Sequence, residues 1–190
     1  MSCHDRRFHE DQWANLLDKE REARWDRPAF LLKMGILPGQ ALLDLGCGPG
    51  FWTFHLAEAA GSTGLVWALD VSGRMLESLA EQNPPPQVKP LLCELPLITL
   101  PDASVDLVWA SFIFHEVVPH ADMAAEIRRV TRPGGKVAVL DWHPDAPSSK
   151  GPPRSERLTA GEIISFLTGA GFQKAEKIWE SSDHYMVAAC

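Results

Sequence analysis

The sequence predicts an α/β fold, a doubly wound, Rossmann-like sheet of seven strands that is mostly parallel and has an antiparallel last strand. Short apolar runs alternate with stretches of helical periodicity along most of the chain. The run Val105–Ser111 (VDLVWAS) is apolar along most of its length, which is typical of a strand buried on both faces of a parallel sheet. The last two runs flank the polar turn Glu180–Asp183, which indicates an antiparallel hairpin.

Local signals place the individual elements. Residues 9–34 have helical periodicity, with Pro28 suited to start a second helical stretch and Gly35 to end it. Ser72 is expected to cap a helix that runs to about Gln82, and Thr159 with Glu162 has the spacing of a capping box. The remaining helices are expected at Phe51–Ala60, Asp122–Val130 and from Thr159 to about Gly169, and strands at Ala41–Leu45, Leu65–Asp70, Val88–Cys93, Val105–Ser111, Lys136–Asp141, Gln173–Trp179 and His184–Ala189.

Turns and loops are expected where proline and glycine gather. The segment NPPP at residues 83–86 forbids regular structure, and Pro133-Gly134-Gly135 predicts a sharp turn. Residues 146–157 are polar and rich in proline, and we expect a surface loop there. The chain is therefore divided into an N-terminal helical segment, residues 1–35, and one main domain, residues 36–190.

Composition limits the classes of partner. The net charge is -7 and the sequence pI is near 5.5, which argues against a nucleic-acid binder because no basic run offsets the acids. The four cysteines are scattered and suggest reduced thiols rather than a disulfide framework. No signal peptide or membrane-spanning run is evident, so we expect a cytoplasmic protein without membrane insertion. Seven tryptophans leave material for an apolar homodimer interface.

A glycine-rich turn, LLDLGCGPG at residues 42–50, follows the first expected strand. Such a turn lets backbone N–H groups approach a ligand closely at the start of a helix. The dinucleotide fingerprint requires a third glycine where this chain has Phe51, and the P-loop pattern requires a Lys-Ser or Lys-Thr pair that is missing after the glycines. Both NAD and nucleoside triphosphates are therefore disfavoured.

The turn resembles the first motif of the class I S-adenosylmethionine (SAM) dependent methyltransferases, in which an acid and then G-x-G-x-G follow a hydrophobic strand. Asp44, Gly46, Gly48 and Gly50 match that motif. By the same resemblance Asp70, which closes LVWALD, is expected to accept hydrogen bonds from both ribose hydroxyls. The resemblance covers roughly residues 36–190, including RPGGKVAVLDW and the final hairpin. It implies that Glu94 lies near the adenine amino group and that Asp106 is the acid that opens the fourth strand. It also implies cofactor contacts from Cys47, Val71, Met75, Leu95 and Ser111.

The chemistry of SAM agrees with these residues. SAM carries a sulfonium, an ammonium, a ribose diol and an adenine, and it has no phosphate. Carboxylates such as Asp44, Asp70 and Glu94 suit that ligand and would repel a pyrophosphate. We therefore expect SAM as the cofactor and S-adenosylhomocysteine (SAH) as the product. In this family the specificity elements lie near the N-terminus, so residues 1–35 are expected to form a lid.

The segment FHEVVPH, residues 114–120, follows the buried fourth strand and offers a candidate base. Its histidines are five residues apart with a proline between them, which breaks the helical spacing of a zinc motif, and we expect no metal site. His115 is the candidate general base, since an imidazole can accept a proton near neutrality; packing against the cofactor is the other interpretation. Residues 141–143 end the fifth strand and face the acceptor side by topology, but we interpret them as a strand-end turn. Phe51 and Trp52 are candidates for an aromatic pocket wall, and we interpret them as core residues.

The leading hypothesis is a SAM-dependent methyltransferase that acts on a small-molecule acceptor. The sequence is similar to the small methyltransferases of ubiquinone and menaquinone biosynthesis, but it is shorter and lacks a substantial insertion over the substrate pocket, which argues against a quinone acceptor. A non-catalytic SAM-binding module and an NAD-linked oxidoreductase are the alternatives. Methyl transfer to an acceptor would exclude the first, and the absence of nicotinamide binding would exclude the second.

Overall fold

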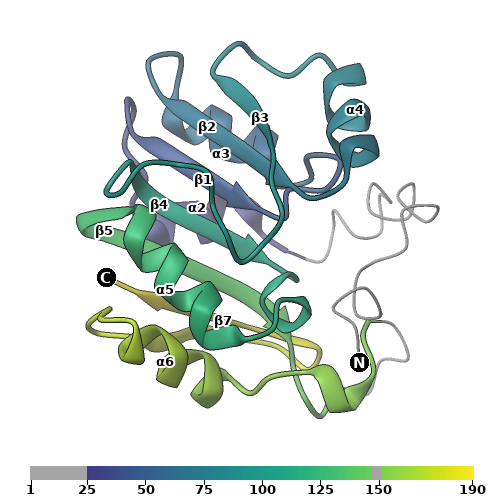
Figure 1. Cartoon of the computed structure of the whole chain (residues 1–190), viewed down its shortest axis with the longest axis vertical. Coiled ribbons are helices and arrows are strands. Elements are labelled where there is room, and N and C mark those ends of the chain that lie inside the picture. Colours follow the sequence, from purple (N-terminus) through teal and green to yellow (C-terminus); the bar gives the residue numbers. More distant parts are fainter. Residues whose placement is uncertain (1–24, 147–150) are drawn as a thin grey trace. The chain divides into compact units, whose positions relative to one another are not determined.

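The computed structural model describes residues 25–146 and 151–190, and its secondary structure is that of a wound α/β protein (Figure 1). The described strands form a seven-stranded sheet of order β3-β2-β1-β4-β5-β7-β6. The elements are α2 (Arg27–Met34), β1 (Ala41–Leu45), α3 (Thr53–Ala60), β2 (Leu65–Asp70), α4 (Gly73–Glu81), β3 (Val88–Leu92), β4 (Val105–Ser111), the 3₁₀ turn η3 (Phe114–Glu116), α5 (His120–Val130), β5 (Thr131–Trp142), the 3₁₀ turn η4 (Arg154–Glu156), α6 (Ala160–Gly169), β6 (Glu176–Glu180) and β7 (His184–Ala189).

The strand directions confirm the predicted fold class. β1 pairs in parallel with β2, β2 with β3, and β4 with β5, whereas β7 pairs antiparallel with both β5 and β6. The chain divides into two compact units, one containing the described residues 25–94 and the other containing residues 95–146 and 151–190. Predicted site residues occur in both units.

In the first unit, three parallel strands are joined by α3 and α4. β1 is buried along its whole length, as expected for an apolar strand with covered faces. α3 packs on β1 and β2, and α4 packs on β2 and β3. The Ser72 side chain accepts a hydrogen bond from the Met75 N–H and begins α4, and Gly61, with a positive φ, ends α3. The cap at Ser72 is as predicted.

The segment 25–34 contributes four buried side chains to this unit, those of Trp25, Phe30, Leu31 and Met34. Pro28 lies in the first turn of α2, and Gly35 ends the helix in the left-handed conformation with φ 63°, as predicted. The Phe30 ring stacks on Trp52 with centroids 6.4 Å apart, and Trp25 meets the Phe51 ring edge-on at 5.9 Å. Phe51 and Trp52 are therefore buried partners of α2, which agrees with their interpretation as core. The first part of the helical prediction, residues 9–24, lies outside the described residues.

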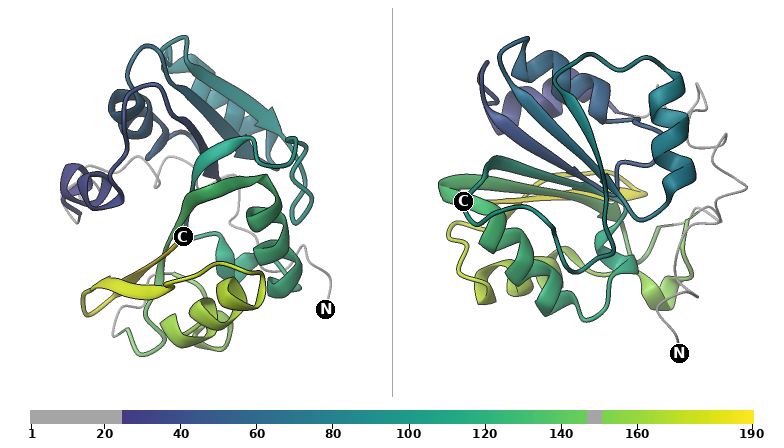
Figure 2. Two further views of the ribbon diagram at one scale, coloured as in Figure 1. Left: turned by 90° about the vertical axis from the view of Figure 1, so that its left-hand side faces the viewer. Right: turned by 45° about the horizontal axis from the view of Figure 1, so that its top comes forward.

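In the second unit, β4 and β5 run parallel and the hairpin β6–β7 extends the sheet (Figure 2). α5 and α6 pack on each other, α5 also contacts β5, and α6 also contacts β7 (Figure 1). The Thr159–Glu162 capping box at the start of α6 is present as predicted. The 98–102 segment is held to α5 by Arg129, whose guanidinium donates to the backbone carbonyls of Ile98 and Leu100.

Several boundaries differ from the sequence prediction, and the starts of β5 and β6 differ most. The smaller differences are that α3 begins at Thr53 rather than Phe51, α5 at His120 rather than Asp122, and that β3 ends at Leu92 rather than Cys93. β5 begins at Thr131 rather than Lys136, because Thr131 pairs with Val105 before the register breaks; residues 132–135 project from the ladder. The expected turn is therefore a bulge inside a strand, and an ion pair of 2.7 Å between Arg132 and Asp106 stabilises it. β6 begins at Glu176 rather than Gln173, since Lys174 has φ 48° and cannot continue an extended chain.

Candidate functional site

The glycine turn after β1 has a backbone that only glycine adopts easily. Gly46, Gly48 and Gly50 have φ angles of 69°, 54° and 99°, in the left-handed region that side chains disfavour. The Cys47 N–H donates to the Leu69 carbonyl at 2.9 Å, which fastens the turn to β2. A Cβ at Gly50 would lie 2.5 Å from the Leu79 side chain, so this glycine also permits close packing of α4. The turn is thus a fixed, bare stretch of backbone.

Asp70 connects this turn to the end of β2. Its Oδ2 accepts the Gly48 N–H at 2.8 Å and its Oδ1 accepts the Ser72 N–H at 2.9 Å. Asp70 therefore acts as a strand-end cap and as the anchor of the glycine turn. Each oxygen of a carboxylate can accept more than one hydrogen bond, so a carboxylate is a suitable partner for a diol. The adjacent backbone carbonyl of Asp70 accepts the Cys93 N–H at 3.0 Å, which places Glu94 directly after this point.

Asp44 is a buried carboxyl within β1, 1% exposed. Its Oδ2 accepts a hydrogen bond of 2.6 Å from the Thr53 hydroxyl, whereas its Oδ1 is buried and has no hydrogen-bond partner among the described residues. Burial raises the pKa of Asp44 to about 7, the Thr53 hydrogen bond opposes that shift, and the negative charge of Asp70 adds to it. Asp44 is thus poised to lose its proton when a cation approaches.

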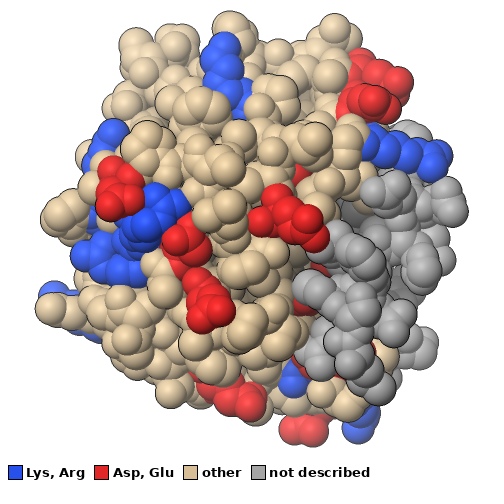
Figure 3. All heavy atoms as spheres, in the orientation of Figure 1, with Lys and Arg blue, Asp and Glu red and all other residues tan. Residues whose placement is uncertain are grey.

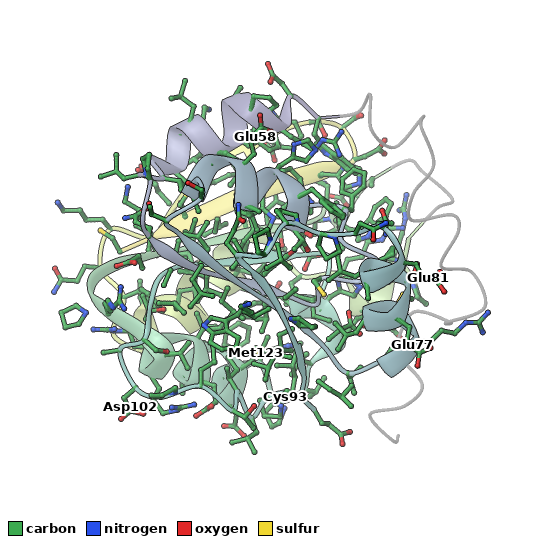
Figure 4. All side chains as sticks on the ribbon, turned by 90° about the horizontal axis from the view of Figure 1, so that it is seen from above. Glu58, Glu77, Glu81, Cys93, Asp102 and Met123 are labelled. Carbon is green, nitrogen blue, oxygen red and sulfur yellow. The ribbon has the colours of Figure 1, made fainter. Side chains whose placement is uncertain are left out.

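The other predicted cofactor residues of this unit differ in exposure. Cys47 is buried, and burial followed by the charges of Asp44 and Asp70 raises the pKa of its thiol, so the residue is a neutral spacer. Val71 is 37% exposed directly after Asp70, and Met75 is buried on α4. Glu94 is exposed after β3 (neighbouring Cys93 is labelled in Figure 4). Leu95 and Ser111, both half-buried, belong to the second unit.

In the second unit, two polar side chains lie near the carboxyl ends of β4 and β5, one after β4 and one within the last residues of β5. Phe112, the residue after β4, has φ 58° and turns the chain, while its N–H donates to the Leu140 carbonyl at 2.8 Å. Three residues later His115 lies in η3, 3% exposed. Its Nδ1 lies 2.7 Å from Oδ1 of Asp141, which is itself only 1% exposed. The structure thus joins two side chains that are 26 residues apart in sequence.

The sequence places Asp141 at the end of the fifth strand, on the acceptor side, but it was interpreted as part of a strand-end turn and its contact with His115 was not predicted. The available signal was positional, because His115 and Asp141 both follow or end neighbouring parallel strands, and the carboxyl ends of such strands meet at one edge. Trp142 contributes a second contact, since its N–H donates to the same Oδ1 at 2.8 Å. Glu116, the other acid of the FHEVVPH segment, lies 3.9 Å from Nε2 of His115.

The histidines of the FHEVVPH segment have separate surroundings. The His120 ring lies against the Phe114 and Phe166 rings, with centroids 6.1 and 5.3 Å away. Within residues 25–146 and 151–190, no group of three His, Cys, Asp or Glu side chains is arranged to hold a metal ion. None of the helices in this described part of the chain is long and apolar enough to cross a membrane.

Comparison with known proteins identifies the family. Residues 43–139, which are 97 of the 190 residues, match the model of the methyltransferase domain. The chain is 32% identical over 136 residues to a demethylmenaquinone methyltransferase of Geobacillus, covering 70% of this chain and 58% of that protein. It is 38% identical over 118 residues to the ubiquinone/menaquinone biosynthesis C-methyltransferase UbiE of Burkholderia orbicola, covering 59% of this chain and 47% of that protein. The chain therefore spans about half the length of these curated relatives.

A solved structure extends the similarity to nearly the whole chain. The SAM-dependent methyltransferase from Aquifex aeolicus superposes with a TM-score of 0.87 and 29% sequence identity, covering 96% of this chain and 98% of that one. The match to the family model includes the end of β1 from Leu43, the glycine turn, Asp70, His115 and most of β5. The chain thus belongs to the methyltransferase-domain family of class I SAM-dependent methyltransferases.

Proposed function

We propose that this protein transfers a methyl group from SAM to a small-molecule acceptor and releases SAH. The observation that carries the proposal is the Asp70 carboxylate, which holds the Gly48 backbone of a turn with three left-handed glycines. This arrangement supports a bound diol beside bare backbone. Membership of a SAM-dependent family supports the identity of the ligand.

The residues present fit SAM in their chemistry. The unpartnered, buried Oδ1 of Asp44 favours a cationic ligand nearby, and the acids of the first unit disfavour a phosphate. In the proposed complex Asp70 accepts the ribose hydroxyls, Glu94 faces the adenine amino group, and the backbone of residues 46–50 contacts the rest of the cofactor, with Val71, Met75, Leu95 and Ser111 as further contacts. When bound, SAM supplies a methyl group activated by its sulfonium.

A small-molecule acceptor is supported by charge. The chain has a net charge of -7, and on the face drawn in Figure 3 the acidic and basic side chains are interspersed. Two relatives carry quinone-biosynthesis names, so a naphthoquinol belongs in any acceptor panel. Incubation with methyl-labelled SAM and a panel of phenols, naphthoquinols, amines and thiols tests the proposal. Labelled product is the expected result. SAH binding without transfer to any acceptor would favour the non-catalytic module.

The N-terminal segment, residues 1–35, remains our proposed lid. Deleting residues 1–34 is expected to weaken SAM binding, but this deletion also removes Phe30 and its ring contact with Trp52. Deleting residues 1–24 alone keeps that contact and separates the two effects. We expect calorimetry to show weaker SAM binding for the shorter deletion with little change in thermal stability. An affinity equal to that of the full chain would show that residues 1–24 are not a lid.

A further inference from the structure

We infer that His115 and Asp141 act as a proton-accepting pair, in which Asp141 positions His115 and Nε2 of His115 removes a proton from the acceptor. This inference rests on the proposed methyl transfer and specifies its substrate class. The acceptor is a group that must lose a proton when it is methylated, such as a phenol, an alcohol, an acidic carbon or a protonated amine.

The distance between the two side chains assigns the roles of the ring nitrogens. An ionised carboxylate can only accept hydrogen bonds, so in the proposed pair, with Asp141 as the carboxylate, the contact of 2.7 Å between Nδ1 and Asp141 Oδ1 places the proton on Nδ1. Nε2 of a neutral ring then carries the lone pair. The Trp142 N–H donates a hydrogen bond of 2.8 Å to the same carboxylate oxygen, which fixes the orientation of the Asp141 side chain. Asp141 in turn orients the imidazole of His115.

The local backbone is strained in a way that favours this pairing. Phe112 occupies the left-handed region, with φ 58°, which is costly for a bulky side chain and is concentrated at functional sites. Its N–H contact with the Leu140 carbonyl ties the exit of β4 to the residue before Asp141. The resulting turn leads directly into η3, where His115 lies.

Stability alone does not explain the pair. Both side chains are almost fully buried, and Oδ2 of Asp141 has no hydrogen-bond partner within the described residues. A buried ion pair is often no more stable than well-packed apolar residues of similar volume, and an unsatisfied buried oxygen is a further cost. A role in proton transfer accounts for retaining both groups.

In the proposed reaction, methyl transfer is coupled to the loss of a proton from the acceptor. The acceptor atom forms a bond to the methyl carbon while the carbon–sulfur bond breaks, and that electron pair passes to sulfur, which becomes the neutral thioether of SAH. The proton of the acceptor passes to Nε2 of His115, giving an imidazolium beside the Asp141 carboxylate. The proton is then lost to solvent, and no oxidant or reductant is needed.

The charges around His115 set the direction of its pH dependence. Burial is the largest single influence and lowers the pKa of His115, but the charge and hydrogen bond of Asp141, with the charges of Glu116 and Glu156, outweigh it and raise the pKa above 6.5. The neutral ring is the base, so the methyl-transfer rate should increase as pH rises through this pKa. Asp141→Asn should lower the pKa and the rate together.

Two readouts on the full-length protein test the inference. The first is NMR of the imidazole of His115, which needs no acceptor: we expect the Nδ1–H tautomer in the wild type and a lower pKa in Asp141→Asn. The second is methyl transfer to the acceptor found with labelled SAM. We expect His115→Asn, which keeps a donor towards Asp141, to lower kcat by about 10²- to 10⁴-fold with SAH affinity unchanged.

His143→Asn is the matched control, because His143 also pairs with a carboxylate, Glu180 at 3.2 Å, but is far more exposed than His115. It should retain wild-type kcat. An Nε2–H tautomer in the wild type, or a His115→Asn variant with unchanged kcat, would overturn the inference and leave methyl transfer standing. A wild type that does not bind SAH would instead overturn the proposed function.

Discussion

Replacing Asp70 with alanine is expected to weaken SAH binding by about 30- to 1,000-fold. Hydrogen bonds to a charged group contribute about 1.5–3 kcal/mol each, and the proposed ribose contact involves two of them; allowing for imperfect geometry, a loss of about 2–4 kcal/mol corresponds to that range. The substitution also releases the Gly48 N–H, which Asp70 accepts at 2.8 Å, and so loosens the turn that faces the cofactor. Calorimetric titration with SAH measures the effect.

Two further variants separate binding from folding. Asp70→Asn keeps the shape and one acceptor oxygen and should lose less affinity than alanine. Glu81→Ala removes an exposed acid from α4 of the same unit (labelled in Figure 4) and should bind SAH like the wild type. Thermal melting of each variant shows whether it is folded. A folded Asp70→Ala protein that binds SAH within threefold of the wild type would exclude Asp70 as a cofactor ligand.

Asp44→Asn is expected to gain stability relative to the wild type as the pH rises from about 4 to about 7. Burial raises the pKa of Asp44 to about 7 from 3.8, so in this window the folded protein holds a proton that the unfolded chain has lost. Folding then binds a proton, and the free energy of unfolding of the wild type falls as pH rises, by at most about 4 kcal/mol. Asparagine does not titrate and escapes this loss.

Urea denaturation of both proteins at pH 4.5 and pH 8 measures the difference. The change in unfolding free energy caused by Asp44→Asn should be more favourable at pH 8 by about 2–4 kcal/mol. Glu77→Gln, at an exposed position of α4, is the control and should show little dependence on pH. An equal effect of Asp44→Asn at both pH values would mean that Asp44 is ionised in the folded protein throughout.

The elements that the sequence predicts best are those whose boundaries are local. β1, β2, β4 and β7 have the expected bounds, and Ser72 and Thr159 begin the helices that they were expected to begin. In each case the signal lies within a few residues of the boundary. The bulge at residues 132–135 was missed because it depends on pairing between Thr131 and Val105, far apart in the sequence.

In the candidate site, too, the features that depend on local sequence were predicted and those that depend on tertiary contacts were not. The glycine turn is predicted from a short motif, and Asp70 from its position at the end of a strand. The structure adds the hydrogen bond between the Gly48 N–H and the Asp70 carboxylate. The pairing of His115 with Asp141 depends on how two strand ends meet and on the left-handed turn at Phe112, which no pattern around either residue reveals. The shifted pKa of Asp44 depends on burial, which the motif alone does not measure.

Calorimetric titration of the full-length protein with SAH, SAM and NAD tests the central claim most directly. The account predicts that SAH and SAM bind at one site per chain and that NAD does not bind, because the acids Asp44 and Asp70 disfavour a pyrophosphate and Phe51 replaces the third glycine of the dinucleotide fingerprint. Binding of NAD without binding of SAH or SAM would contradict the account and would make the glycine turn a dinucleotide site.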